Sequence, residues 1–235
     1  MNSIKDSSLS SGANLSPFYE RLLQFPLFQG MSRTELHQMS GNTRFDFRKV
    51  SAGKTVVDND SSCSELFFLV SGSVTITSLS DDNSYRVTEL LHAPWITQPE
   101  SLFGMTLRYT SKVVTETDCQ FIILSKDEVL RMFDDIFTFR LNMLNYLSMR
   151  VQQSSHKVWR RAPKNLIDRL ARFFADHCKY PAGHKVFSIL MKQLALEVND
   201  SRLDVSTALN TMQKDGLIEL HRGRIVIPSL ERLFM

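Results

Sequence analysis

A chain of 235 residues with 43% hydrophobic and 23% charged side chains has the composition of an ordinary globular protein, long enough for one large domain or two modest ones. Its three cysteines, Cys63, Cys119 and Cys178, are too scattered for a disulfide framework or a cysteine-based metal site. We therefore expect buried thiols in a reducing, cytoplasmic compartment.

The net charge of +3 is unevenly distributed along the chain. Residues 1–155 carry 14 Lys+Arg against 17 Asp+Glu, whereas residues 156–235 carry 14 against 8. A basic module on a mildly acidic body is typical of a nucleic-acid reader, because phosphate neutralisation supplies most sequence-independent affinity. A surplus of solvated Lys and Arg would give the same totals, so the charge indicates nucleic-acid binding only together with a motif.

The N-terminal part of the chain changes character twice. Residues 1–17 are rich in Ser and Asn and predict a disordered tail without a secretory signal. Residues 18–25 and 33–39 have apolar side chains at helical spacing. Between residues 45 and 124, short apolar or alternating runs separated by turn signals predict a sandwich or small barrel; these runs are residues 55–57, 66–70, 74–76 and 121–124. We expect a β-barrel domain over residues 18–134.

A long helix follows the predicted barrel. Ser125 has the character of an N-cap, and Glu128 would complete a capping box, so a helix begins at Lys126. Over residues 135–159 a second helix carries side chains at alternating spacings of four and three, the seam of a two-stranded coiled coil. The members of this predicted dimer interface are Phe137, Leu141, Leu144, Ser148, Val151, Ser155 and Val158.

The same helix has further apolar residues, Ile136, Met143 and Leu147, on its other face. Two apolar faces favour two neighbours, its own barrel and the helix of a second copy. Burial against one large domain would explain the same pattern. No stretch of the sequence is long enough to span a bilayer, so we expect no membrane partner.

Residues 159–163 predict a hinge, with Pro163 placed to open the next helix and a C-terminal domain over residues 160–235. A short strand at residues 186–189 precedes a segment, residues 191–218, that has the pattern of two helices joined by a tight turn. Ser201 is expected to cap the second helix through its hydroxyl, with Asp204 in the first turn. Two strands around Arg222-Gly223-Arg224 then predict a hairpin with a basic tip.

Short polar side chains and an arginine at the start of a helix suit the reading of base edges in the major groove. We therefore predict a recognition helix beside a phosphate-binding hairpin. The predicted DNA-binding residues are Ser201, Arg202, Leu203, Asp204, Ser206, Thr207, Asn210, Arg222 and Arg224.

At this point the sequence resembles the Crp/Fnr superfamily of catabolite-activator-like regulators. The resemblance is carried by residues 25–30, by the paired-glycine frame of residues 50–60 and 65–76, and by residues 195–218. It implies an α+β protein with an N-terminal cyclic-nucleotide-binding-type double-stranded β-helix (jelly-roll) barrel, a long dimerisation helix and a C-terminal winged helix-turn-helix. It further implies a homodimer whose barrels sense a signal and whose recognition helices enter successive major grooves.

The family's phosphate-binding cassette runs from Gly-Glu to an Arg followed by Ser or Thr. Here the arginine position holds Tyr109, and Arg108 is one residue early, which in a strand points a side chain to the opposite face. The resemblance places the effector pocket at Glu100, Arg108, Tyr109, Thr110, Ser154 and Ser155. Without the matched cation we expect that cyclic AMP is not the effector, and we predict no cofactor and no metal.

The sequence thus predicts a bacterial, sequence-specific transcription regulator that is not an enzyme. Its expected partners are double-stranded DNA with a palindromic operator, a second copy of the chain, and RNA polymerase. Two alternatives remain: a cyclic-nucleotide-binding regulatory subunit, and a dimerisation protein with a vestigial sensor and no specific DNA binding.

Overall fold

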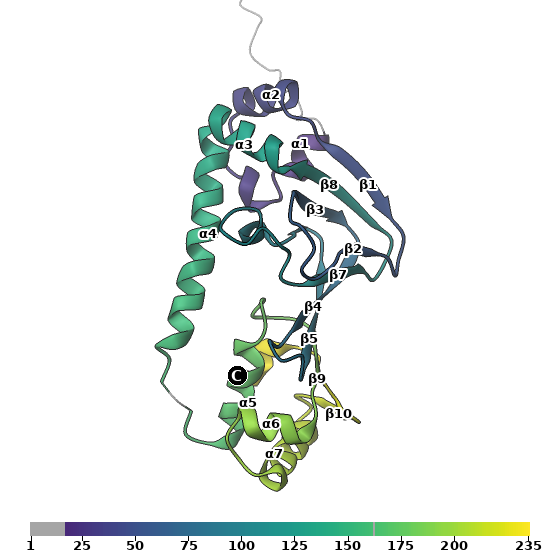
Figure 1. The fold of residues 1–235 in the computed structure, drawn as a ribbon, viewed down its shortest axis with the longest axis vertical. Coiled ribbons are helices and arrows are strands. Elements are labelled where there is room, and N and C mark those ends of the chain that lie inside the picture. Colours follow the sequence, from purple (N-terminus) through teal and green to yellow (C-terminus); the bar gives the residue numbers. More distant parts are fainter. Residues whose placement is uncertain (1–16, 162) are drawn as a thin grey trace, which may run out of the picture.

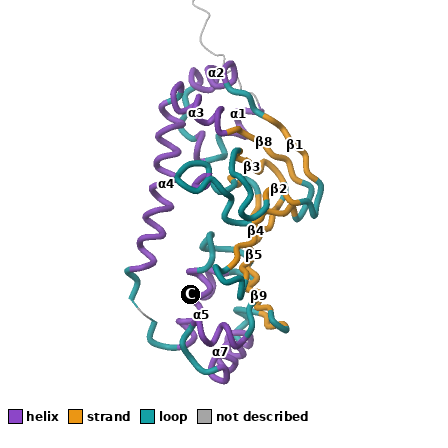
Figure 2. Tube along the Cα trace, in the orientation of Figure 1, coloured by secondary structure: helices purple, strands orange, loops and turns teal. Residues whose placement is uncertain are grey.

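The computed structural model describes residues 17–161 and 163–235 (Figure 1). The expected tail at residues 1–16 and Ala162 of the expected hinge lie outside the described residues. Pro17, which we assigned to the tail, instead begins the first helix. The described part divides into a β-rich upper half and a helical lower half, joined along one side by a long helix (Figure 2).

The upper half begins with short helices and continues as strands. The helical elements are α1 (Pro17–Leu22), η1 (Pro26–Phe28) and α2 (Arg33–Asn42). The strands are β1 (Asp46–Val50), β2 (Thr55–Val57), β3 (Glu65–Ser71), β4 (Ser73–Leu79), β5 (Arg86–His92), β6 (Trp95–Ile96), β7 (Lys112–Thr115) and β8 (Cys119–Ser125), with the 3-10 turn η2 (Pro99–Ser101) before β7.

Helices α3 (Lys126–Asp135) and α4 (Phe137–Val158) connect this half to the lower one. The lower half contains α5 (Leu166–Asp176), β9 (Lys185–Ser188), α6 (Met191–Glu197), α7 (Arg202–Lys214), β10 (Glu219–His221), β11 (Arg224–Ile227) and η3 (Leu230–Phe234). Helix α5 begins after Asn165, whose side-chain oxygen accepts from the Asp168 amide, so Pro163 does not open it. An asparagine N-cap satisfies an exposed amide, which proline two residues earlier does not do.

The strands form antiparallel sheets that extend from one half of the molecule to the other. One sheet has the order β1-β8-β3-β6, and the second has the order β10-β11-β9-β5-β4-β7-β2. Strand β9 of the lower half pairs with β5 of the upper half, with Val87 opposite Phe187. The hairpin β10–β11 is therefore continuous, through β9, with the sheet of the barrel.

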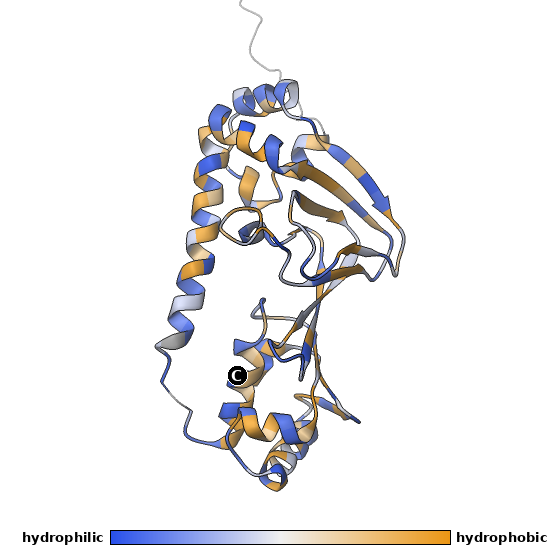
Figure 3. Ribbon diagram, in the orientation of Figure 1, coloured by the Kyte–Doolittle hydropathy of each residue, from blue (hydrophilic) through white to orange (hydrophobic). Residues whose placement is uncertain are grey.

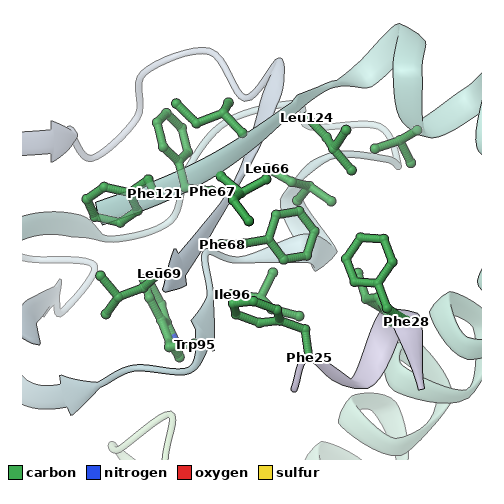
Figure 4. Close-up of a cluster of buried hydrophobic side chains, with 14 of the residues drawn as sticks. Phe25, Phe28, Leu66, Phe67, Phe68, Leu69, Trp95, Ile96, Phe121 and Leu124 are labelled. Atoms are coloured by element: carbon green, nitrogen blue, oxygen red, sulfur yellow. The ribbon is translucent and has the colours of Figure 1, made fainter. Parts of the chain in front are cut away.

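Aromatic side chains fill the barrel core (Figure 4). The Phe68 ring lies 5.2 Å from the Phe25 ring and 5.3 Å from the Phe28 ring, centroid to centroid. Phe139 of α4 lies 5.4 Å from Phe28, so α4 closes one side of the same core. Burial of such large apolar side chains is the main stabilising contribution to this half.

The expected α+β class is confirmed: a β-rich domain, a long helix and a C-terminal helix-turn-helix are all present. Ser125 caps α3 by accepting from the Glu128 amide. The expected capping box is not formed, because the Glu128 carboxylate accepts from the Arg44 amide and pairs with Arg131. None of the described helices is both long enough and apolar enough to cross a membrane.

Candidate nucleic-acid interface and effector cleft

Helix α7 is fixed by its buried face and presents its other face to solvent. Val205, Leu209 and Met212 are fully or almost fully buried and anchor the helix in the lower core. The Ser201 hydroxyl accepts from the Asp204 amide at 3.1 Å and donates to the Asp204 carboxylate at 2.6 Å. The start of the helix is thereby capped, which holds its first turn in place.

The predicted reading residues lie on the outer side of α7. Arg202 and Asn210 are exposed, Leu203 is 76% exposed, and Ser206 is half-buried. The Thr207 hydroxyl, also exposed, donates to the Leu203 carbonyl at 3.0 Å. This face therefore combines an arginine, an apolar side chain and short polar groups, the set that can contact base edges.

The turn before α7 sets the angle between α6 and α7. Asn199 has φ of 51°, a left-handed conformation that asparagine tolerates better than most residues. Asp200 pairs with Arg169 of α5, which joins the turn to the neighbouring helix. The two helices are consequently held as one unit with the rest of the lower half.

The hairpin of β10 and β11 carries the basic tip at Arg222-Gly223-Arg224, and both arginines are exposed. Gly223 has φ of 69°, which a side chain would strain. The Gln213 side chain near the end of α7 accepts from the Leu220 amide at 2.9 Å. This bond joins the hairpin to α7.

Helix α4 has an exposed apolar stripe opposite its barrel contacts. Met143 and Phe139 are buried against the barrel. The residues of the predicted dimer seam are exposed instead: Phe137 65%, Leu141 43%, Leu144 57% and Val151 68%, with Ser148 and Ser155 exposed as well. Val158 ends the helix, and its side chain lies outside the described residues. Four large apolar side chains in solvent on one helix are typical of a surface that a partner covers.

Of the predicted effector residues, the structure brings Glu100 and Ser154 to one cleft of about 680 Å³ between η2, the second half of α4, and the segment at residues 176–179. The Glu100 carboxylate lies 3.6 Å from the Arg150 guanidinium on α4. Thr110 lies at the edge of this region, where its hydroxyl donates to Gln98 at 2.9 Å. Ser155, next along the helix, is exposed.

Arg108 and Tyr109 do not join that group, which corrects our placement of them in the pocket. The Tyr109 ring is buried in the barrel core, and its hydroxyl donates to the Glu65 carbonyl at 2.7 Å. Burial raises the pKa of this phenol far above its usual range, so it stays a neutral donor. Arg108 points to the surface and donates to the Asp60 carbonyl at 2.6 Å. Neither side chain is free to meet a ligand in the cleft.

The sequence did not indicate a cation that the structure places beside Thr110. Lys179, in the loop after α5, donates from Nζ to the Thr110 hydroxyl at 2.7 Å. Burial, the largest influence, lowers the pKa of this ammonium group, although Glu100 opposes the shift. The two residues are 69 positions apart, so no local pattern could have paired them.

Glu89 of β5 holds the same loop in place. Its carboxylate accepts from the amides of Lys179 and Tyr180 at 2.8 and 3.1 Å and pairs with Lys185 of β9 at 2.8 Å. Both charged side chains of this pair are almost completely buried, at 1% and 0% exposure. The Trp95 indole adds a bond to the Tyr180 hydroxyl at 2.6 Å. The one sequence signal for the Glu89–Lys185 pair was Glu89 itself, a charged residue at an inward-facing position of a strand with alternating side chains.

Two family descriptions match the chain in the order of its halves. Residues 47–135 match the cyclic nucleotide-binding domain, and residues 168–234 match the Crp-like helix-turn-helix domain. Together they cover more than half of the chain. The cAMP-activated global transcriptional regulator Vfr of Pseudomonas aeruginosa is 22% identical over 189 residues, which span 77% of this chain and 88% of that protein.

Solved structures share the same fold. The c-di-GMP responsive global regulator CLP of Xanthomonas campestris matches with a TM-score of 0.50 and 19% identity, over 84% of this chain and 99% of that one. A transcriptional regulator of the crp/fnr family from Eubacterium rectale matches with a TM-score of 0.51 and 18% identity, over 89% and 96% of the two chains.

The order of barrel, long helix and helix-turn-helix defines a DNA-binding transcription regulator with an effector-sensing domain. The chain belongs to the Crp/Fnr superfamily of transcriptional regulators.

Proposed function

We propose that this regulator acts as a homodimer that reads a near-palindromic DNA site through α7 and grips the adjacent backbone through the β10–β11 hairpin. The observation that carries the proposal is the exposed face of α7, with Arg202 in its first turn and the basic tip at Arg222 and Arg224 tied to its other end. Base contacts specify a site, whereas phosphate contacts position the protein on it. Arg202 is accordingly the base reader and Arg224 the phosphate contact.

The dimer in this proposal forms through the exposed stripe of α4. Paired helices would present two copies of α7 related by a two-fold axis, which requires half-sites about one helical turn, or roughly 34 Å, apart. RNA polymerase is the proposed protein partner, since a regulator bound to an operator acts on transcription through that enzyme. The operator then mirrors the symmetry of the protein.

The proposed sensing half responds to an effector other than cyclic AMP. At the position where the family's arginine would meet a cyclic phosphate, Tyr109 supplies only a neutral hydroxyl that already donates to the Glu65 carbonyl. A regulatory subunit built around a cyclic nucleotide would show no salt-dependent DNA affinity, and a vestigial sensor would show no response to any small molecule. These outcomes separate the alternatives from the proposal.

Two substitutions at the DNA surface test the assignment of roles. Arg202→Ala is expected to weaken binding to a selected operator by about 1 to 3 kcal/mol and to relax sequence preference. Arg224→Ala is expected to weaken all sequences alike and to reduce the salt slope by about one unit. Lys54→Ala, at an exposed barrel lysine, is the matched loss of charge away from the surface.

Fluorescence anisotropy on operator and random DNA, at several salt concentrations, gives both quantities. Equal losses on operator and random DNA for Arg202→Ala would remove this residue from base reading. If Lys54→Ala lowered DNA affinity as much as Arg224→Ala, the loss at the hairpin would be explained by net charge and not by a phosphate contact at Arg224.

A further inference from the structure

The charges around the effector cleft do not balance, and this imbalance indicates the chemistry of its ligand. The cleft is lined by charged side chains of η2, of the connecting helix α4, and of the end of α5 with the loop after it, which belong to the lower half (Figure 1). The charged lining residues are Glu100, Arg150, Lys157, Asp176 and Lys179.

Both carboxylates of this set already have arginine partners. Glu100 lies 3.6 Å from Arg150, and Asp176 lies 3.6 Å from Arg160. Arg150 is held further by a bond from its guanidinium to the Lys179 carbonyl at 3.1 Å. Each carboxylate of the lining therefore has an arginine within ion-pair distance.

The two lysines have only neutral partners. Lys157 donates to the carbonyls of Asp176 and Cys178 at 2.9 and 3.5 Å, and Lys179 donates to the Thr110 hydroxyl at 2.7 Å. Within residues 17–161 and 163–235, neither ammonium group forms an ion pair with a carboxylate. Two partly buried ammonium groups without a carboxylate within ion-pair distance favour an anion, because a paired ionic group is far less costly to desolvate than an isolated one.

We propose that this cleft binds a small phosphate monoester, whose charge is met by Lys157 at the end of α4 and Lys179 of the DNA-binding half. A phosphate monoester carries about −1.5 to −2 charges at pH 7, which matches two lysines, whereas a cyclic phosphodiester carries one. A volume of about 680 Å³ is in the range of pockets that bind small molecules. The inference deepens the proposal that the barrel half senses an effector and rests on it.

A phosphate monoester bound in the cleft would lie beside the contacts that join the two halves of the molecule. Lys179 adjoins Tyr180, and the amides of both residues are held by Glu89 of the barrel. An anion that draws on the Lys179 ammonium competes with the bond to Thr110. The ligand would thereby change the contact between the loop and the barrel and so bias the position of the DNA-binding half.

Titration calorimetry on the full chain tests the inference with AMP, 2-glycerophosphate, cyclic AMP and adenosine as probes. We expect at least one monoester to bind, AMP to bind about tenfold more tightly than cyclic AMP, and adenosine to bind weakest. Lys157→Gln and Lys179→Gln should each weaken the monoester about tenfold, whereas Lys54→Gln should leave its affinity unchanged.

The inference is overturned if neither monoester binds, if cyclic AMP binds as tightly as AMP, or if the affinity for the monoester is the same in Lys157→Gln, Lys179→Gln and the parent protein. DNA affinity measured on the same preparations separates the two proposals. Normal DNA binding without monoester binding removes only the inference about the cleft, whereas monoester binding without DNA binding removes only the proposed DNA-reading function.

Discussion

The two halves of α4 make contacts of different kinds. Its first half packs against the barrel through buried Phe139 and Met143. Its second half meets the DNA-binding part through Arg150 and Lys157, which bond to carbonyls of residues 176–179. Figure 3 shows the same division, with apolar segments on the upper helix and polar ones in its last turns.

This difference separates a fixed attachment from an adjustable one. Apolar packing is lost only when the core opens, so the first half of α4 moves with the barrel. Polar contacts at a partly exposed junction can exchange with water, ions or a ligand at a small free-energy cost. A signal bound near the second half can therefore alter the junction without unfolding the sensor.

The largest expected effect is a loss of dimer stability on changing the exposed apolar stripe, which runs along both halves of α4. Glu at Leu144 and Val151 would place like charges at two facing layers of the proposed dimer, each costing several kcal/mol of dimer stability. Light scattering should report a monomer. Leu130→Glu with Met149→Glu, which changes exposed apolar side chains outside the stripe, should remain dimeric. A stable dimer of the first variant would move the interface elsewhere.

A pair of truncations compares the two halves directly. Phe139→Ala should destabilise the barrel by about 3 to 5 kcal/mol, nearly independently of salt, because it empties a buried aromatic site. Arg150→Ala should cost only about 1 to 2 kcal/mol, and less at high salt, since Arg150 and Glu100 are both partly exposed.

Urea unfolding at low and high salt measures both truncations, with Phe47→Ala, at a 63% exposed barrel position, as the control for the first. A large, salt-independent loss for Arg150→Ala would contradict the division between apolar and polar attachment.

The smallest effect concerns Cys178, which lies at the junction. Burial raises the pKa of its thiol to about 12 from an ordinary value of 9.0. Because the folded state holds this proton more tightly than the unfolded state, the thiol's contribution to stability is present below about pH 9 and is lost as the pH rises toward 12. At pH 8.5, iodoacetamide should alkylate Cys178 slowly in the native protein and quickly in urea. Equally fast alkylation in both states would show that the thiol is not protected.

The sequence predicted features that depend on neighbouring residues. Ser201 caps α7 as expected, because its partner Asp204 lies three positions away. A true capping box joins Ser32 to Glu35, and its Ser-x-x-Glu spacing could have revealed it. The box expected at Ser125 fails because Glu128 is engaged by Arg44, a residue 84 positions distant.

The junction could not be predicted for the same reason. The contact of Lys179 with Thr110 and the pairing of Lys185 with Glu89 join residues 69 and 96 positions apart. Side-chain direction also mattered at the predicted pocket, where the Tyr109 hydroxyl turns to a core carbonyl instead of the cleft. The spacing of residues along the chain indicates which face of a helix or strand is apolar. It does not indicate which polar group from a distant part of the sequence will contact that helix or strand.

Selection of bound sequences from a random DNA pool, carried out with the full chain in the presence and absence of cell extract, tests the central claim of a dimeric DNA reader most directly. We predict enrichment of a near-palindrome whose half-sites are centred about 10 base pairs or a multiple of that apart, lost in the Leu144→Glu, Val151→Glu double variant. The claim would be contradicted if no sequence were enriched under either condition. It would also be contradicted if a single asymmetric half-site were enriched and the double variant bound that site equally well.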